Sequence, residues 1–212
     1  MLRSAASPTG SEKPACRRVK RGACLRTGCI TALLVTLACA APVHAGPPDL
    51  PEGLGMWVWT KSAFATEEAR QRLIRFCRDY GITHLDVQLR FAKDDPNPRL
   101  LNGEAFRELV LLASRHNITT AVLRGNPRMF ASRNHERSLR ELNAIIAFAA
   151  SLSQKSLLRG IKYDVEPYLT KEWKGKGKPL NTLMHDYLLF LRKAKTVLQG
   201  KAPHLWLAVD TP

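Results

Sequence analysis

Short apolar runs alternate with amphipathic stretches along residues 54–210, which predicts strands alternating with helices. The expected strands cover residues 54–59, 83–90, 119–124, 161–166 and 205–210. Apolar residues at helical spacing predict helices at 67–80, 103–113, 135–154 and 183–198. Thr66 is expected to cap the first helix and Gly81 to end it. The expected buried residues are, in the first helix, Leu73, Phe76, Cys77 and Tyr80 and, in the second, Phe106, Leu109, Val110 and Ala113. Strands that alternate with helices pair in parallel through right-handed crossovers. The pattern therefore predicts an α/β fold.

No glycine-rich phosphate loop follows the first expected strand, so a (β/α)-barrel of the TIM type is favoured over a dinucleotide-binding sheet. A closed barrel has eight units and about 250 residues, whereas this chain has 212 residues. We expect an incomplete, truncated barrel of about five units over residues 54–212. An open doubly wound parallel sheet is the alternative.

Within the strands, polar and apolar side chains alternate, so each strand has a polar face. Leu85, Val87 and Leu89 are expected to meet the helices, whereas Asp86, Gln88 and Arg90 are expected to face a barrel interior. The polar faces of the fourth and fifth strands carry Lys162, Asp164, Glu166 and Asp210. Unpaired buried polar groups are costly, which indicates a ligand site. The alternative is a structural salt-bridge network of Asp86, Asp164 and Glu166 with Arg90, Arg124 and Lys162.

The segment Gly160-Ile-Lys-Tyr-Asp-Val-Glu-Pro-Tyr168 holds the most specific signal. Asp164 and Glu166 are two residues apart, so their carboxyl groups lie on one face of the strand. Two adjacent carboxylates resist ionising together, so one pKa rises and that group can act as an acid near neutral pH.

This segment resembles the fourth-strand motif D-G-x-D-x-D-x-E of family-18 (chitinase-like) glycoside hydrolases. Gly160, Asp164 and Glu166 match it, while Arg159 and Lys162 occupy its first two acidic positions. Glu166-Pro167 also resembles the fourth-strand acid/base of retaining-clan glycoside hydrolases. Both resemblances imply a (β/α)8 barrel with Glu166 as general acid/base. The first implies that Asp164 orients a nucleophilic acetamido group of the substrate, and the second requires another carboxylate from a seventh strand.

The resulting hypothesis is an exported glycoside hydrolase-like protein that acts on polysaccharide or oligosaccharide, without metal or other cofactor. Glu166 and Asp164 are the expected catalytic residues. Trp57 and Trp59 are expected to stack on sugar rings, unless they plug the bottom of the barrel or pack under helices. The other expected substrate contacts are Gln88, Arg90, Arg124, Tyr168 and Asp210. Two alternatives stay open: a non-catalytic carbohydrate-binding remnant, favoured by Arg159 and Lys162, and a metal-dependent hydrolase using Asp86, Asp164, Glu166 and Asp210.

The net charge of +15 is unevenly distributed. Residues 1–45 combine seven basic and one acidic side chain with an apolar run at 29–41 and a small-residue site ending at Ala45. This arrangement is typical of a signal peptide, followed by a linker at 46–53, and predicts a secreted or periplasmic protein. An uncleaved N-terminal anchor is the alternative. Four of the five cysteines lie in this segment. The fifth, Cys77, lies on the apolar face of an expected helix and is therefore expected to be an inert core thiol.

The charge that remains does not indicate nucleic acid, because basic and aromatic residues are not interleaved on one face. We predict a carbohydrate partner, with no nucleic acid and no membrane after signal removal. The basic, glycine-rich loop 171–178 is either a solvated loop or a contact for acidic polysaccharide.

Overall fold

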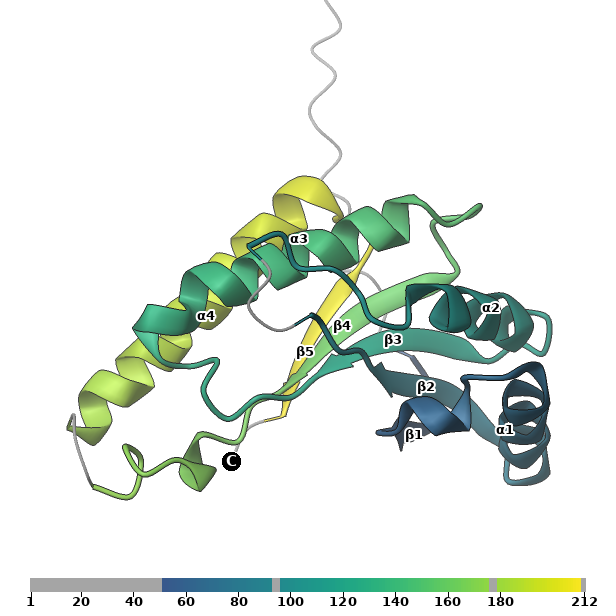
Figure 1. The fold of residues 1–212 in the computed structure, drawn as a ribbon, viewed down its shortest axis with the longest axis horizontal. Helices are drawn as coiled ribbons and strands as arrows, with labels where there is room; N and C mark the ends of the chain where they lie inside the picture. Colours follow the sequence, from purple (N-terminus) through teal and green to yellow (C-terminus); the bar gives the residue numbers. More distant parts are fainter. Residues whose placement is uncertain (1–50, 93–95, 176–178, 211–212) are drawn as a thin grey trace, which may run out of the picture. The chain divides into compact units, whose positions relative to one another are not determined.

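The computed structural model describes residues 51–92, 96–175 and 179–210 (Figure 1). The expected signal peptide and all of the linker before Pro51 lie outside these residues. The strands are β1 (Leu54–Val58), β2 (Ile82–Gln88), β3 (Thr119–Arg124), β4 (Leu158–Asp164) and β5 (Trp206–Asp210). The α-helices are α1 (Glu67–Asp79), α2 (Gly103–Ser114), α3 (His135–Ala150) and α4 (Leu180–Lys201). Short 3-10 helices span Lys61–Ala63 (η1), Ser132–Asn134 (η2) and Pro167–Leu169 (η3).

All five strands pair in parallel, in the order β1-β2-β3-β4-β5. The α/β class and the alternation of five parallel strands with helices are therefore confirmed. The described strands form an open sheet with β1 and β5 at its edges. The C-terminal ends of all five strands consequently meet along one edge of the sheet.

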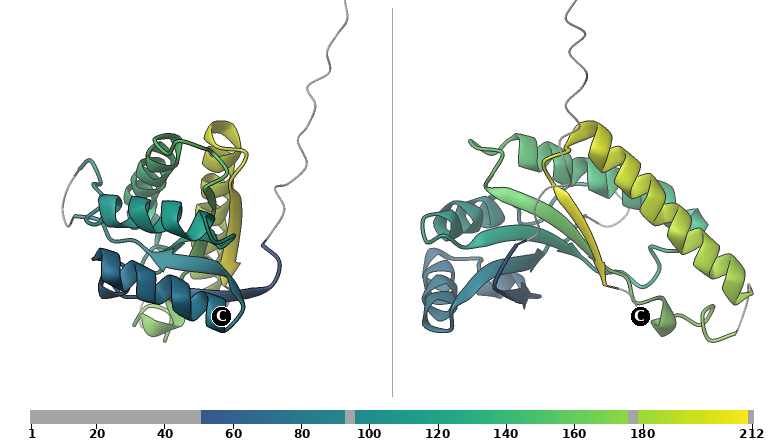
Figure 2. Two further views of the ribbon diagram at one scale, coloured as in Figure 1. Left: turned by 90° about the vertical axis from the view of Figure 1, so that its right-hand side faces the viewer. Right: turned by 180° about the vertical axis from the view of Figure 1, so that it is seen from behind.

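The helices pack against the apolar face of the sheet (Figure 2). Leu85, Val87 and Leu89 of β2 are completely buried on this face, as the alternation predicts. The expected inner face of α2 is also confirmed, because all four of its members are buried: Phe106, Leu109, Val110 and Ala113. Among the described residues no helix combines the length and apolarity that a membrane span requires.

Helix α1 begins and ends as its sequence predicts. The Thr66 hydroxyl oxygen accepts a hydrogen bond from the Ala69 amide at 3.2 Å, and Gly81 takes a φ of +66° just beyond the helix. Cys77 is fully buried, and burial raises the pKa of its thiol to about 11, as suits an inert core residue.

The predicted buried face of α1 is partly wrong. Phe76 and Tyr80 are 45% and 66% exposed. Their rings pack against each other, with centroids 4.5 Å apart. The helix instead buries Ala69, Ile74 and Cys77. The reason is positional: α1 covers the end of the sheet beside the edge strand β1, so only one flank of its apolar arc meets the core.

Candidate functional site

The uncovered face of the sheet carries the polar side chains that the alternation predicts. Paired Cα positions in parallel strands share a face, and the register pairs Trp57 with Asp86 and Asp164 with Asp210. Gly160 pairs with Trp206, and Lys162 pairs with Ala208, on the same face. Four of the predicted site residues are thereby brought to one face near the C-terminal ends of the strands: Trp57, Gln88, Asp164 and Asp210.

Lys162 lies at the centre of this surface. Its Nζ is 3.4 Å from Oδ2 of Asp86 and 3.4 Å from Oδ1 of Asp210. The same ammonium lies 4.8 Å from the centroid of the Trp57 ring, within cation–π range. Lys162 therefore joins β1, β2 and β5 through one side chain on β4. Sequence reasoning placed Lys162 on this face but did not assign it to the site.

The network continues from Asp86 to His84, which the sequence analysis missed. His84 Nε2 is 2.8 Å from Asp86 Oδ1, and His84 Nδ1 is 2.7 Å from Thr119 Oγ1. The signal was available, since His84 is two residues before Asp86 on the same strand face. Asp86 is thus held from two sides, by His84 and by Lys162.

Trp206 closes this face behind His84, with the two ring centroids 5.7 Å apart. Its indole lies directly over Gly160, where an added Cβ would be only 2.1 Å from Cδ2 of the ring. Glycine is therefore needed at position 160 for close approach of the indole. Packing against the Trp206 indole thus explains why glycine occupies position 160 of the motif.

The two predicted catalytic carboxyls lie at the end of β4. Asp164 is the last residue of the strand and is buried. Burial raises its pKa, the charges of Glu166 and Asp210 raise it further, and Lys162 opposes the rise. The expected pKa rise within this carboxyl pair is therefore found at Asp164, the residue predicted to orient the substrate.

Glu166 lies two residues beyond Asp164 and precedes η3 as its N-cap residue. Its carboxylate accepts a hydrogen bond from the Tyr168 hydroxyl. This hydrogen bond raises the pKa of Tyr168. Tyr168, predicted as a substrate contact, therefore holds the proposed acid/base in place.

The two tryptophans at the end of β1 remain accessible. Trp57 and Trp59 are each 40% exposed, and their rings meet edge to face with centroids 5.4 Å apart. This exposure argues against the alternative in which both rings pack inside. Gln88 is half-buried at the end of β2, and Arg90 is exposed just beyond it.

Arg124 does not join this surface, so the alternative in which it pairs with Asp86, Asp164 and Glu166 is wrong. It lies on the helix-covered face, where its Nη2 is 2.5 Å from Oε2 of Glu141 on α3. Nη1 donates to the Leu89 carbonyl at 2.8 Å, and the guanidinium stacks over the Phe91 ring. The strand residues 119–124 lack polar–apolar alternation, so their pattern could not assign a face.

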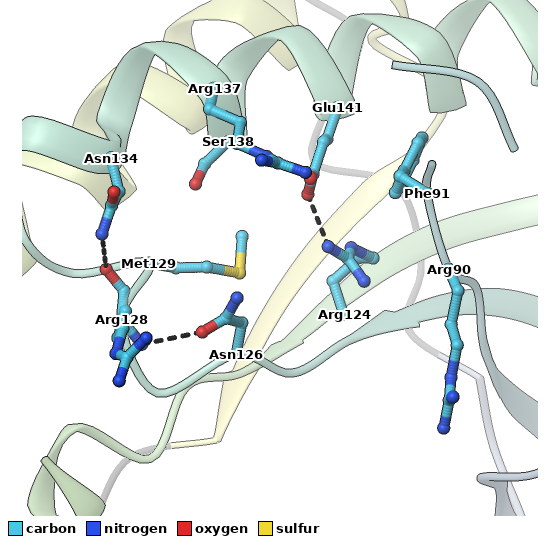
Figure 3. A pocket seen from close by; sticks show the side chains of 10 residues that line it. All are labelled: Arg90, Phe91, Arg124, Asn126, Arg128, Met129, Asn134, Arg137, Ser138 and Glu141. Atoms are coloured by element: carbon cyan, nitrogen blue, oxygen red, sulfur yellow. Dashed lines mark hydrogen bonds and ion pairs between the residues drawn. The ribbon is translucent and has the colours of Figure 1, made fainter. Parts of the chain in front are cut away.

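A pocket of about 400 Å³ opens beside the loop that follows β3 (Figure 3). Ser138 and Glu141 on α3 face Arg124 and Met129 across it. The loop starts at Gly125, where an added Cβ would be 2.9 Å from the carbonyl oxygen of Asp164. Asp164 and Glu166 are not among the described residues that line this pocket, which opens on the helix-covered side.

The residues considered as alternative metal ligands do not gather as a metal site requires. Within residues 51–92, 96–175 and 179–210, no three His, Cys, Asp or Glu side chains form a group that could hold an ion. Asp86 and Asp210 are instead bridged by the Lys162 ammonium. The geometry assigns these two carboxylates to ion pairing.

Comparisons of the chain with models of known protein families and with curated proteins find no match.

Proposed function

We propose that this protein is an exported glycoside hydrolase-like protein, with Glu166 as its general acid/base. The observation that carries the proposal is the pairing of Asp164 and Glu166 at the end of β4. They are close enough for the charge of Glu166 to raise the pKa of Asp164. They share this surface with the exposed rings of Trp57 and Trp59, which suit sugar stacking.

We also propose that the sheet belongs to a (β/α)-barrel architecture. Its strand order follows the chain without reversal, whereas a doubly wound sheet reverses its strand order at a switch point. The polar groups collect at the C-terminal strand ends, where barrel enzymes place their active sites.

In the proposed reaction, Glu166 donates its proton to the glycosidic oxygen as the bond to the anomeric carbon breaks. The acetamido oxygen of the substrate forms the new bond to that carbon, and Asp164 orients the acetamido group. Water then opens this intermediate, and Glu166 takes the proton from the water. Asp164 orients the acetamido group by accepting a hydrogen bond from its N–H, which leaves the acetamido oxygen free to attack.

The Tyr168 hydroxyl fixes the rotamer of Glu166 throughout this sequence. Gln88, Arg90 and Asp210 are proposed to bind sugar hydroxyls along the same strand ends. Lys162 positions Asp210 and does not itself contact the reacting bond in this proposal.

A Glu166→Gln variant tests the proposal. Reducing-end release from N-acetylated amino-sugar oligosaccharides and from glucan oligosaccharides would be measured for the full chain. Loss of an acid/base group is expected to lower kcat by about 10²–10⁴-fold. Glu108→Gln, an exposed carboxylate-to-amide change on α2, is the matched control and should retain the wild-type rate. Hydrolysis that is unchanged in Glu166→Gln would overturn the catalytic role.

One observation favours a second function, non-catalytic carbohydrate binding. Lys162 occupies an acidic position of the chitinase-like motif and neutralises Asp86 and Asp210. A binding protein would retain saccharide affinity in both variants and release no reducing ends in either. Measuring both reducing-end release and saccharide affinity in the two variants therefore separates the two functions.

A further inference from the structure

The chain leaves β4 through a short turn that carries the proposed acid/base. Glu166 is the N-cap residue of η3, and its carbonyl accepts a hydrogen bond from the Leu169 amide at 3.1 Å. Thr170 is the C-cap residue of η3 and is buried. Because β4 ends at Asp164, the position of the Glu166 backbone depends on how this turn is held.

The Thr170 side chain joins η3 to the chain that follows it. Its hydroxyl donates to the Pro167 carbonyl at 2.7 Å and accepts a hydrogen bond from the Trp173 amide at 3.3 Å. The Thr170 amide donates to the same Pro167 carbonyl at 2.9 Å. Only a group that is both donor and acceptor can make the two side-chain bonds at once, and a hydroxyl is such a group.

Trp173 attaches this turn to the body of the protein. Its ring meets the ring of Phe130 edge to face, with centroids 6.1 Å apart. Phe130 lies in the segment between β3 and α3 and is fully buried, and Trp173 packs against the same core. Arg133 and Glu172 join the two segments again through an ion pair of 3.0 Å. That pair lies near the surface, where ion pairs contribute little, so the aromatic contact is the stronger attachment.

A continuous series of contacts therefore runs from the core to the proposed acid/base: Phe130, Trp173, Thr170, Pro167 and Glu166. We propose that Thr170 is a positioning residue for Glu166, which acts by fixing η3 to Trp173. Pro167 follows Glu166 directly, so a shift of the Pro167 carbonyl also moves Glu166. A misplacement of about 1 Å in an active site costs about 10²-fold in rate. This inference rests on the proposed function for the catalytic role of Glu166.

Thr170→Val and Thr170→Ser form the test pair. Valine keeps the branched shape and removes the hydroxyl, whereas serine keeps the hydroxyl. For reducing-end release by the full chain, kcat is expected to fall about 10- to 100-fold in Thr170→Val and less than about 2-fold in Thr170→Ser. KM should change by less than about 2-fold in both, because the lost interaction acts on the acid/base and not on substrate binding. Circular dichroism would show that each variant is folded under the assay conditions.

The matched control is Thr196→Val on α4. Its exposed hydroxyl also donates to a backbone carbonyl, that of Arg192 at 3.0 Å, so the same chemical change is made far along the chain from η3. This variant should retain the wild-type kcat. Trp173→Ala removes the attachment itself and is expected to lower kcat as Thr170→Val does.

Titration of Tyr168 reports on Glu166 without relying on turnover. The hydrogen bond from the Tyr168 hydroxyl to Glu166 raises the pKa of this tyrosine. Ultraviolet absorbance of tyrosinate against pH, with Tyr168→Phe as the reference in each background, isolates this group. Thr170→Val is expected to return the pKa of Tyr168 toward its ordinary value, because Glu166 moves away from the hydroxyl. Thr170→Ser and Thr196→Val should keep it raised.

A wild-type kcat together with an unchanged Tyr168 titration in Thr170→Val would overturn the inference. Equal losses of kcat in Thr170→Val and Thr170→Ser would also overturn it, because the hydroxyl would then not be the group that matters. Failure of the proposed function has a different signature, which is hydrolysis unaffected by Glu166→Gln. The Tyr168 titration then still decides whether Thr170 positions the Glu166 carboxylate.

Discussion

The two faces of the sheet use charge in opposite ways. On the helix-covered face, Arg124 and Glu141 form a buried ion pair inside an apolar core. On the uncovered face, Lys162 lies between Asp86 and Asp210 on a partly accessible surface. The first cluster links a strand to a helix, and the second links strands to one another.

This difference separates the charges that stabilise the fold from the charges that are available to a ligand. A nearly buried charge depends on its partner for compensation, because little of it is exposed to water. The charges on the uncovered face can exchange partners with a ligand, because they remain near solvent. We therefore expect changes on the helix-covered face to act first on stability, and changes on the uncovered face to act more on binding and titration.

The largest expected effect is that of Glu141→Ala. This change leaves the Arg124 guanidinium buried without its carboxylate, which should reduce the free energy of unfolding by about 3–5 kcal/mol. Urea denaturation followed by circular dichroism measures the loss. The control is Glu136→Ala on the same helix, whose carboxylate pairs with Arg140 near the surface. This control variant should lose about 0.3–0.5 kcal/mol in the free energy of unfolding. Equal losses for the two variants would contradict the distinction between the buried ion pair and the surface ion pair.

Gly160→Ala tests packing on the uncovered face and should have an intermediate effect. The new methyl group would overlap the Trp206 indole, so the ring must move, at a cost of about 1–3 kcal/mol in the free energy of unfolding. Gly200→Ala is the matched control, since nothing lies within 4 Å of its Cβ position near the end of α4. That change should stabilise the protein by up to about 1 kcal/mol. A Gly160→Ala variant as stable as Gly200→Ala would contradict the close packing.

A Trp206→Leu background sharpens this test. The smaller side chain relieves the overlap, so Gly160→Ala should cost less there than in the wild-type protein. The difference between the two costs is the interaction energy of a double-mutant cycle. A cost that is the same in both backgrounds would mean that Trp206 is not the obstacle.

The sequence predicted what depends on local periodicity. Alternation in β2 assigned Asp86 and Leu85 to opposite faces, and the spacing of Phe106, Leu109 and Val110 identified the buried side of α2. It could not predict contacts that depend on register or on helix placement. Arg124 and Glu141 are 17 residues apart on a strand and a helix, and no periodic signal connects them.

The candidate site shows the same limit. The proximity of Asp164 and Glu166 follows from their closeness along the chain, although β4 ends at Asp164 and Glu166 precedes η3. The bridge from Lys162 to Asp86 and Asp210 requires the parallel register of β2, β4 and β5, which no single segment encodes. The alternation placed Lys162 on the polar face and among the possible partners of Asp86, and the structure adds Asp210 and Trp57 as its neighbours.

The smallest expected effect concerns Asp164 and depends on pH. Its folded-state pKa is raised, mainly by burial, so the folded protein binds this proton more tightly than the unfolded chain. Its contribution to stability is therefore lost as pH rises from about 4 through the folded pKa. Asp164→Asn removes this loss, so its free energy of unfolding relative to wild type should increase between pH 4 and pH 7. Because Lys162 opposes the rise, the increase should be larger in a Lys162→Met background. Urea denaturation at each pH measures the free energy of unfolding of the Asp164→Asn variant and of the wild type. A difference between the two that stays constant from pH 4 to pH 7 would show that the pKa of Asp164 is not raised in the folded protein.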